Sequence, residues 1–190
     1  MMKIEELYRL FTQSEGVTTD SRAIKPGCIF FALKGDNFDG NDFAAAAIEK
    51  GASWSVADKA DVAGEKIIMV DNVLSTLQQL ARYHRGQLGI PLFALTGTNG
   101  KTTTKELVSA VLSAKYKVAS TAGNLNNHIG VPLTLLKMDS STEMAVVEMG
   151  ASGPGEIRDL CEIARPDMGL ITNVGKAHLL GFGSFEGVKK

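Results

Sequence analysis

Residues 91–106, PLFALTGTNGKTTTKE, constrain the fold of this chain more than any other stretch. The apolar run 91–95 is followed by a turn with two glycines, and apolar residues then recur at helical spacing, at Leu107, Val108, Val111 and Leu112. A change from a continuous apolar run to a period of three or four residues is typical of a strand that passes through a turn into a helix. The stretch therefore predicts a buried strand, a glycine turn and a helix, in that order.

The turn has the composition of a phosphate-binding loop. Gly97 and Gly100 let backbone N–H groups approach an anion, and a helix beginning at Lys101 directs the positive end of its dipole to the same place. The Lys101 ammonium would meet the outer phosphates, and the Thr102 hydroxyl is a suitable ligand for Mg²⁺. We therefore predict that a nucleotide binds to seven consecutive residues, Gly97, Thr98, Asn99, Gly100, Lys101, Thr102 and Thr103.

The loop is shorter than the commonest phosphate loop. The pattern G-x-x-x-x-G-K-[ST] requires glycine at position 95, where this chain has Leu95, so the motif is TGTNGKT. A glycine turn before a helix is common in proteins of many kinds. Adjoining Lys and Thr residues after an apolar strand are not, and they favour nucleotide binding.

Composition and charge exclude several classes of protein. The chain has 190 residues, 44% of them hydrophobic, which is enough for one large or two small packed domains. A formal net charge of −1 provides no basic excess for nucleic acid or an anionic membrane, and no apolar run approaches the length that spans a bilayer. Acidic Glu5 and Glu6 stand where a secretory signal needs positive charge, and the distant Cys28 and Cys161 indicate neither a disulfide framework nor a zinc site. We therefore expect a cytoplasmic protein without nucleic-acid or membrane partners.

Strand patterns alternate with helical patterns along the chain. Strands are predicted at 28–33, 54–57, 66–70, 91–95, 117–121, 143–148 and 168–172, with helical segments between most of them. This rhythm predicts an α/β fold with parallel sheets, in which ligands bind at the carboxyl ends of the strands. We expect a small N-terminal α/β domain at 1–85 and a phosphate-loop domain at 86–190. In the first domain, Phe43, Ala46 and Ala47 should face inward from a helix.

An acid and a histidine follow predicted strands of the second domain. Glu148 ends the apolar strand 143–148, the position from which a nucleotide-bound Mg²⁺ is usually held, although a strand-end Glu can also be merely solvated. His178 comes just after the strand 168–172 and is a candidate ligand for a second Mg²⁺, although a lone histidine is more often structural. His84, between arginines on a helix, is predicted to lie on the surface, and the role of His128 is left open.

Three segments resemble the ATP-dependent Mur ligases of peptidoglycan synthesis. They are TGTNGKTTT at 96–104, EMGAS at 148–152 and TNVGKAH at 172–178. Within that family, TDSR at 19–22, FALKG at 31–35 and NLNNHIGVP at 124–132 are most similar to the branch that adds D-alanyl-D-alanine to UDP-N-acetylmuramoyl-tripeptide. The phosphate loop alone would also be compatible with folylpolyglutamate synthetase, but that relative lacks a segment like Asp-Ser-Arg at 20–22 of this chain.

The resemblance implies roles for individual residues. The first domain would hold the UDP end of the substrate through Ser21, Arg22, Lys34 and Gly35. Lys101, Glu148 and His178 would be the catalytic residues, with Mg²⁺ held by Thr102, Glu148 and His178. Asn126 and Asn127 would lie in a substrate-side loop near the transferred phosphate. Position 41, usually histidine in the family, is Asn41 here, which weakens any claim of a contact there.

The implied reaction is an ATP-dependent ligation. ATP phosphorylates the tripeptide carboxyl group, and the amine of D-alanyl-D-alanine attacks the acyl phosphate, so the protein contributes positioning and electrostatic stabilisation rather than a nucleophile. Family members continue beyond the length of this chain, so we expect a truncated central domain with an exposed sheet edge and no ligase activity from these 190 residues alone.

Three other functions stay open from the sequence. One is a ligase that adds lysine or diaminopimelate to the dipeptide precursor, which the asparagine-rich loop disfavours. The second is a UDP-sugar-binding module without catalysis. The third is a small phosphate-loop kinase or switch, although no lid or second substrate-binding segment is visible after the loop.

Overall fold

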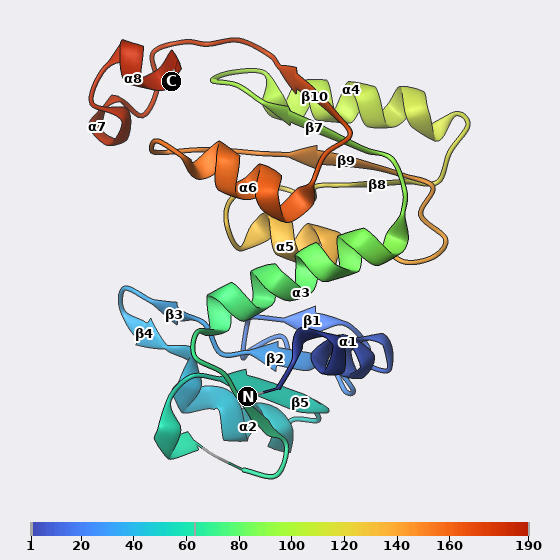
Figure 1. Cartoon of the computed structure of the whole chain (residues 1–190), viewed down its shortest axis with the longest axis vertical. Coiled ribbons are helices and arrows are strands. Elements are labelled where there is room, and N and C mark those ends of the chain that lie inside the picture. Colours follow the sequence, from blue (N-terminus) through green and yellow to red (C-terminus); the bar gives the residue numbers. More distant parts are fainter. Residues whose placement is uncertain (1, 63, 190) are drawn as a thin grey trace. The chain divides into compact units, whose positions relative to one another are not determined.

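The computed structural model describes residues 2–62 and 64–189, so the outer limits of the expected domains, residues 1 and 190, lie outside it. The chain forms two compact units that divide between His84 and Arg85. Each unit contains a four-stranded sheet in which every strand pair is parallel (Figure 1). The predicted α/β class with parallel sheets is therefore confirmed.

The sheet of the first unit has the strand order β1-β2-β5-β6. Its strands are β1 (Val17–Thr18), β2 (Ile29–Phe31), β5 (Trp54–Ala57) and β6 (Ile67–Met69). A separate antiparallel hairpin consists of β3 (Lys34–Gly35) and β4 (Phe38–Asp39). The helices are α1 (Ile4–Thr12), α2 (Ala44–Glu49), most of α3 (Val73–Leu88) and the 3₁₀ turns η1 (Gly40–Phe43) and η2 (Ala60–Val62).

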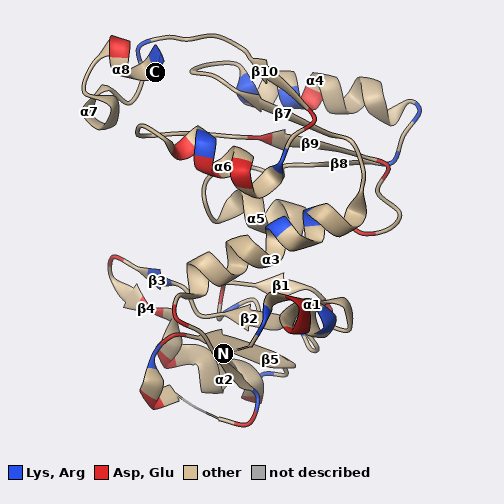
Figure 2. Cartoon of the chain, viewed as in Figure 1, with Lys and Arg blue, Asp and Glu red and all other residues tan. Residues whose placement is uncertain are grey.

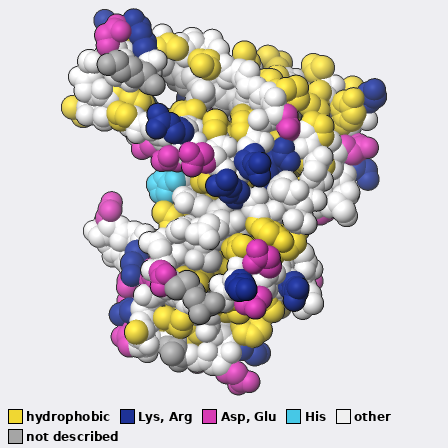
Figure 3. Space-filling view, viewed as in Figure 1, with side chains coloured by type: hydrophobic (Ala, Val, Ile, Leu, Met, Phe, Trp, Pro, Cys, Tyr) yellow, Lys and Arg dark blue, Asp and Glu magenta, His cyan; other side chains and the backbone are white. Residues whose placement is uncertain are grey.

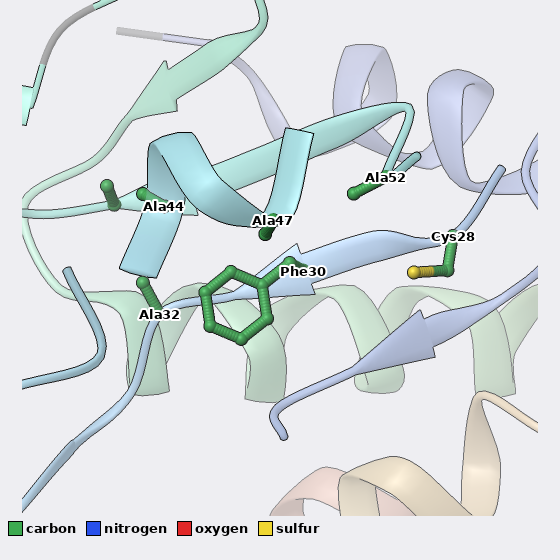
Figure 4. Packing of buried hydrophobic residues seen from close by; sticks show 7 residues of the cluster. Cys28, Phe30, Ala32, Ala44, Ala47 and Ala52 are labelled. Carbon is green, nitrogen blue, oxygen red and sulfur yellow. The ribbon is translucent and has the colours of Figure 1, made fainter. Parts of the chain in front are cut away.

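Helices cover both faces of this sheet. Ile29, Phe30 and Phe31 of β2 are all buried, which is the pattern of a parallel strand packed on two sides. Figure 4 shows α2 on one side of β2 and α3 on the other. The Phe30 ring fills the space beneath α2, where small side chains let the helix approach, and the buried cluster comprises Cys28, Phe30, Ala32, Ala44, Ala47, Ala52 and Ala57.

The prediction that Phe43 faces inward is wrong. Its side chain is 44% exposed, whereas Ala44 and Ala47 are buried and Ala46 is half-buried. The reason is local: residues 40–43 form the 3₁₀ turn η1, and α2 begins only at Ala44. The inward positions are therefore counted from Ala44.

The prediction that His84 lies on the surface is also wrong. His84 is 5% exposed, and its Nδ1 shares a hydrogen bond of 3.2 Å with the Tyr8 hydroxyl. The Phe11 ring meets the imidazole edge-on, with ring centroids 5.1 Å apart. Burial, followed by the charge of Tyr83, raises the pKa of Tyr8 above its usual value, so this hydroxyl stays protonated as part of the α1–α3 packing.

The sheet of the second unit has the strand order β10-β7-β9-β8. Its strands are β7 (Leu92–Thr96), β8 (Val118–Ser120), β9 (Met144–Glu148) and β10 (Met168–Ile171). Figure 1 shows α4 (Lys101–Ser113) on one face and α5 (Gly130–Leu135) with α6 (Glu156–Ala164) on the other. The short helices α7 (Leu179–Phe182) and α8 (Phe185–Lys189) follow β10. Strands β9 and β8 lie on one side of β7, and β10 lies on the other. The carboxyl end of β7 is therefore at a topological switch point, the place where α/β sheets bind ligands.

Helix α4 exposes two of the four apolar residues that recur at helical spacing, while Val108 and Leu112 are half-buried. Leu107 is 64% exposed and Val111 is 75% exposed, and Figure 3 shows hydrophobic side chains gathered over α4. The residue that α4 buries is Lys105, at 1% exposure.

Charged residues of both signs are interspersed over the elements in Figure 2, and single helices such as α1 and α6 carry both acids and bases. Among residues 2–62 and 64–189, none of the helices has the length and apolar character needed to cross a bilayer.

Candidate functional site

The phosphate loop lies where the sequence predicts, between β7 and α4. Gly97 and Gly100 both have positive φ, 135° and 77°, which glycine adopts without strain. A Cβ at Gly97 would collide with Thr172 Oγ1 and the Asn173 backbone, whereas a Cβ at Gly100 would meet nothing within 4 Å. Gly97 is therefore needed for packing against the end of β10, and Gly100 for the turn into the helix.

The segment after β10 braces the loop. The amides of Thr98 and Asn99 donate to the backbone oxygen and side-chain oxygen of Asn173, both at 3.1 Å. The Asn99 carbonyl accepts from Thr172 Oγ1 at 2.7 Å and from Asn173 Nδ2 at 2.9 Å, and the Gly175 amide donates to Thr98 Oγ1 at 2.8 Å. Because β7 and β10 are parallel neighbours, their carboxyl ends meet, and this is what brings the two segments together. The sequence reasoning missed the bracing role of Thr172 and Asn173, which the order of the strands would have indicated.

Four amides of the loop remain available to an anion. In the described part of the chain, the backbone N–H groups of Gly100, Lys101, Thr102 and Thr103 donate to no protein acceptor. They lie at the start of a thirteen-residue helix, so the helix dipole adds to their attraction for negative charge. The predicted amides of Thr98 and Asn99, in contrast, are engaged with Asn173.

The Lys101 side chain folds back over its own loop. Its Nζ donates to the carbonyl of Gly97 at 2.8 Å and to that of Thr98 at 3.3 Å. These neutral carbonyls are weaker partners for an ammonium group than phosphate oxygens. The ammonium group is thus held at the loop, where an incoming phosphate group would meet it.

Glu148 meets Thr102 at the carboxyl end of β9. The Thr102 hydroxyl donates to Glu148 Oε2 at 3.0 Å, and Asn126 Nδ2 donates to Oε1 at 2.8 Å. The residue is 2% exposed, and its backbone N–H donates to Thr121 Oγ1 at 2.9 Å. The β7–β9 register, which pairs Leu95 with Glu148, puts this carboxylate beside the loop.

These oxygens fit Mg²⁺, a hard cation that binds one or two protein oxygens and keeps several waters. The hydroxyl of Thr102 and the carboxylate of Glu148 are two candidate ligands that the geometry brings together. His178 is not among them. It has a left-handed backbone, with φ at 50°, and lines the same pocket as Lys101. Within residues 2–62 and 64–189, no three His, Cys, Asp or Glu side chains converge as a metal site.

A pocket of about 340 Å³ opens beside the loop. The loop residues Gly97 and Lys101 form one wall, and the segment before α6 forms another. The remaining lining residues include Arg158, Ile171, Asn173, Val174, His178, Phe182 and Lys189. The apolar side chains in this set suit a flat ring system, and the cations suit an anionic group.

The two predicted asparagines have different surroundings. Asn126 contacts the Glu148 carboxylate, and its carbonyl accepts from the Gly150 amide at 2.8 Å. Asn127 Oδ1 accepts from the amides of Ile129 and Gly130, at 3.1 and 2.9 Å, so its side chain fixes the entry to α5. Asn126 belongs to the site beside the phosphate loop, whereas the Asn127 oxygen stabilises a turn.

The candidate UDP contacts lie at one edge of the first sheet. Ser21 and Arg22 follow β1, and Lys34 and Gly35 follow β2, its parallel neighbour. Arg22 donates through Nε and Nη2 to the carboxylate of Asp20, both at 2.9 Å, which lowers the pKa of Asp20 to about 2. Arg22 itself is 87% exposed, so its guanidinium is held in place and remains open to solvent.

Lys34 and the hairpin are held by a buried amide. Asn41 is fully buried, donates to Asp39 Oδ1 at 2.7 Å and Asp58 Oδ1 at 2.9 Å, and accepts from the Asp58 amide. Lys34 Nζ lies 2.8 Å from Asp58 Oδ1. Burial acts to raise the pKa of Asp58, but hydrogen bonds from Lys34, Asn41 and the Val73 amide outweigh it and lower that pKa. Asn41 therefore has a structural role, because its amide joins the hairpin residue Asp39 to Asp58.

Two protein-family models match most of the chain. Residues 13–85 match the Mur ligase family catalytic domain, and residues 95–190 match the Mur ligase middle domain. The UDP-N-acetylmuramoyl-tripeptide–D-alanyl-D-alanine ligase of Bacillus subtilis is 44% identical over 180 residues, which is 93% of this chain and 39% of that protein. The chain thus spans about two fifths of the length of the curated relatives it matches.

Solved structures agree with the sequence relatives. A crystal structure of MurF from Acinetobacter baumannii has a TM-score of 0.87 and 35% identity, covering 95% of this chain and 43% of that one. MurF ligase from Thermotoga maritima, solved in complex with ADP, has a TM-score of 0.86 and 39% identity, covering 95% of this chain and 42% of that one. Family models match both units, and the loop before α4 and the carboxylate at the end of β9 agree with them. This chain belongs to the Mur ligase family.

Proposed function

We propose that the chain is the substrate-binding and nucleotide-binding part of a ligase that adds D-alanyl-D-alanine to UDP-N-acetylmuramoyl-tripeptide. The contact between Thr102 and Glu148 beside four available loop amides carries this proposal. The names of relatives at 44% identity support the choice of substrates. The cytoplasmic location expected from the sequence is part of this proposal.

Residues 86–190 are proposed to bind Mg²⁺·ATP. The loop amides and Lys101 would hold the phosphates, and Thr102 with Glu148 would hold Mg²⁺, which would neutralise negative charge on the phosphates. The ADP complex of the Thermotoga maritima relative supports the nucleotide. His178 lines the pocket next to Lys101 and is proposed to face the substrate-side metal or phosphate. The chemistry assigned to these side chains is electrostatic, since phosphoryl transfer to a carboxylate needs no protein nucleophile.

Residues 1–85 are proposed to hold the UDP end of the substrate. Arg22 is exposed and fixed by Asp20, which suits a diphosphate because the guanidinium does not have to be ordered on binding. Ser21, Lys34 and Gly35 share the same sheet edge with it. Lys34 would exchange part of its contact with Asp58 for the anionic ligand.

Nucleotide binding is tested directly with the 190-residue chain and a fluorescent ATP analogue, titrated with and without Mg²⁺. Lys101→Ala should weaken the Mg²⁺-dependent affinity about tenfold to a hundredfold, because a hydrogen bond to a charged group contributes about 1.5–3 kcal/mol. Lys115→Ala is the matched control: it removes a lysine that follows α4 and stacks on Tyr116, away from the loop. Failure of the wild-type chain to bind Mg²⁺·nucleotide would overturn the proposal.

Ligation itself is proposed to require more sequence than these 190 residues, since the relatives are more than twice as long. Incubation with ATP, UDP-N-acetylmuramoyl-tripeptide and D-alanyl-D-alanine should release no ADP above the background rate. Formation of the amide product by this chain would contradict that part of the proposal.

A further inference from the structure

Lys105 is a buried cation to which the proposed nucleotide chemistry gives no role. It lies on α4, one turn after the phosphate-loop residues, and is 1% exposed. Burial of an ammonium group is costly unless the charge is paired and hydrogen-bonded. Strong contacts of the Lys105 ammonium group are therefore needed to offset its burial, while Leu107 and Val111 of the same helix stay exposed.

The shorter of its two contacts is to a backbone carbonyl. Lys105 Nζ donates to the Thr121 oxygen at 2.7 Å and forms an ion pair of 2.9 Å with Glu106 Oε1. The Glu106 side chain is 66% exposed, so that pair is partly screened by water and contributes little. The bond to Thr121 is buried and charge-assisted, which makes it the stronger of the two.

Thr121 is fixed by all three of its polar groups. Its amide donates to the Val146 carbonyl at 3.1 Å, its Oγ1 accepts from the Glu148 amide at 2.9 Å, and its carbonyl accepts from Lys105. The residue is 1% exposed and immediately follows β8. Thr121 therefore connects α4 to the end of β9, at the residue that carries the candidate metal carboxylate.

These contacts form a closed ring with the candidate Mg²⁺ ligands. From Thr102 the ring passes to the Glu148 carboxylate, from the Glu148 amide to Thr121, and from Thr121 to Lys105. Lys105 then returns to Thr102 along α4, where residues three apart lie on the same face. The Thr102 hydroxyl and the Glu148 carboxylate are thus connected by their own hydrogen bond and also by the route through Lys105.

A cation held by both oxygens would replace the hydrogen bond between them. The path through Lys105 and Thr121 would persist and help to set the distance between the two oxygens. We propose that Lys105 is a positioning residue for the Mg²⁺ pocket, acting through Thr121 on Glu148. The proposal rests on the proposed Mg²⁺·nucleotide binding and deepens it.

The test measures metal binding rather than ligation. For wild type, Lys105→Met and Glu106→Gln, the Mg²⁺ concentration that gives half of the metal-dependent gain in ADP affinity is determined, and Mn²⁺ binding in the presence of ADP is followed by electron paramagnetic resonance. Lys105→Met should raise both metal midpoints about tenfold, the lower end of the range for residues that orient metal ligands. ADP affinity in EDTA should not change. Glu106→Gln removes the negative charge of the exposed partner and should leave both midpoints at the wild-type value.

If Lys105→Met does not fold, a second variant tests the connection from Thr121 to Glu148. Thr121→Val keeps the shape of the side chain and removes the oxygen that accepts from the Glu148 amide, so it should raise the metal midpoints by a similar factor. Unchanged midpoints in a folded Lys105→Met chain, or in Thr121→Val where the former is unfolded, would overturn the inference.

The two proposals fail in different ways. If wild type binds Mg²⁺·ADP, Lys101→Ala binds it more weakly and Lys105→Met behaves like wild type, only the role of Lys105 is wrong. If wild type shows no metal-dependent nucleotide binding, the proposed function is overturned, and the role of Lys105 with it.

Discussion

The Thr102 hydroxyl donates to Glu148 Oε2 across 3.0 Å, which joins the first turn of α4 to the carboxyl end of β9. The two residues are 46 positions apart in the chain, and the parallel pairing of β7 with β9 brings them together. A hydroxyl and a carboxylate at this separation can both turn an oxygen toward one cation.

Glu148→Gln should remove most of the metal dependence of nucleotide binding. The neutral amide keeps the size of the side chain but loses the charge that attracts Mg²⁺, so the metal midpoint should rise at least about tenfold. Nucleotide affinity without metal should hold or improve, because a negative charge near the phosphates is gone. Titration of a fluorescent ATP analogue at several Mg²⁺ concentrations measures this, and an unchanged midpoint would exclude Glu148 as a ligand.

Gly97→Ala and Gly100→Ala should differ in stability although both replace a glycine with positive φ. The Gly100 site is open, so its cost should be the backbone strain of about 1–2 kcal/mol. At Gly97 the new methyl group also collides with Thr172 and Asn173, so the loss should exceed that of Gly100→Ala. Urea unfolding of the two variants gives the comparison, and equal losses would contradict the close packing of the loop against the end of β10.

Asn41→Ala should destabilise the first unit by about 1–3 kcal/mol, since the buried Asp58 amide loses its acceptor and two carboxylates lose a donor. Asn41→Asp should be worse near neutral pH, because a third carboxylate would face Asp39 and Asp58, and should recover as the pH falls and that group binds a proton. Asn37→Ala, at an exposed position in the hairpin, is the control. Thermal melts between pH 5 and pH 8 measure the effect.

Asp20 should titrate far below an ordinary aspartate. Hydrogen bonds from Arg22 lower its pKa from 3.8 to about 2, so its carboxylate stabilises the folded loop above about pH 4 and this contribution is lost as the pH falls toward 2. In Arg22→Gln the pKa should return toward 3.8. Carboxyl chemical shifts followed by NMR across this pH range measure the pKa of Asp20. An equal Asp20 pKa in wild type and in Arg22→Gln would show that the ion pair does not form in solution.

The sequence was sufficient for the parts of the site that follow from local pattern. The glycine turn, Lys101 and Thr102 are adjacent in the chain, and an acid at the end of an apolar strand is visible as soon as the strand is recognised. Parallel-strand geometry then places Glu148 at the same edge as the loop. The roles of these residues toward ligands stay predictions.

The sequence was insufficient where a nonlocal contact decides the environment. Apolar periodicity on α4 gave no sign that Lys105 is buried, because its partner is the carbonyl of Thr121, and any residue type presents a carbonyl. His84 is buried because the Tyr8 hydroxyl, 76 positions away, offers a partner. The orientation of Phe43 was predicted wrongly because α2 begins only at Ala44, after this residue. The first residue of a helix is the least reliable feature of an assignment from sequence pattern.

The dependence of the phosphate loop on Asn173 has a consequence for truncation. In the described sheet, β10 pairs with one neighbour, β7, and all four of its residues are exposed, yet the segment that follows it supplies the acceptors for Thr98 and Asn99. A shorter chain that stopped at Pro166 would keep every residue of the TGTNGKT motif but would lose the hydrogen bonds from Thr98 and Asn99 to Asn173. The shape of the proposed nucleotide-binding loop therefore depends on the segment that follows an edge strand, which the motif itself does not include.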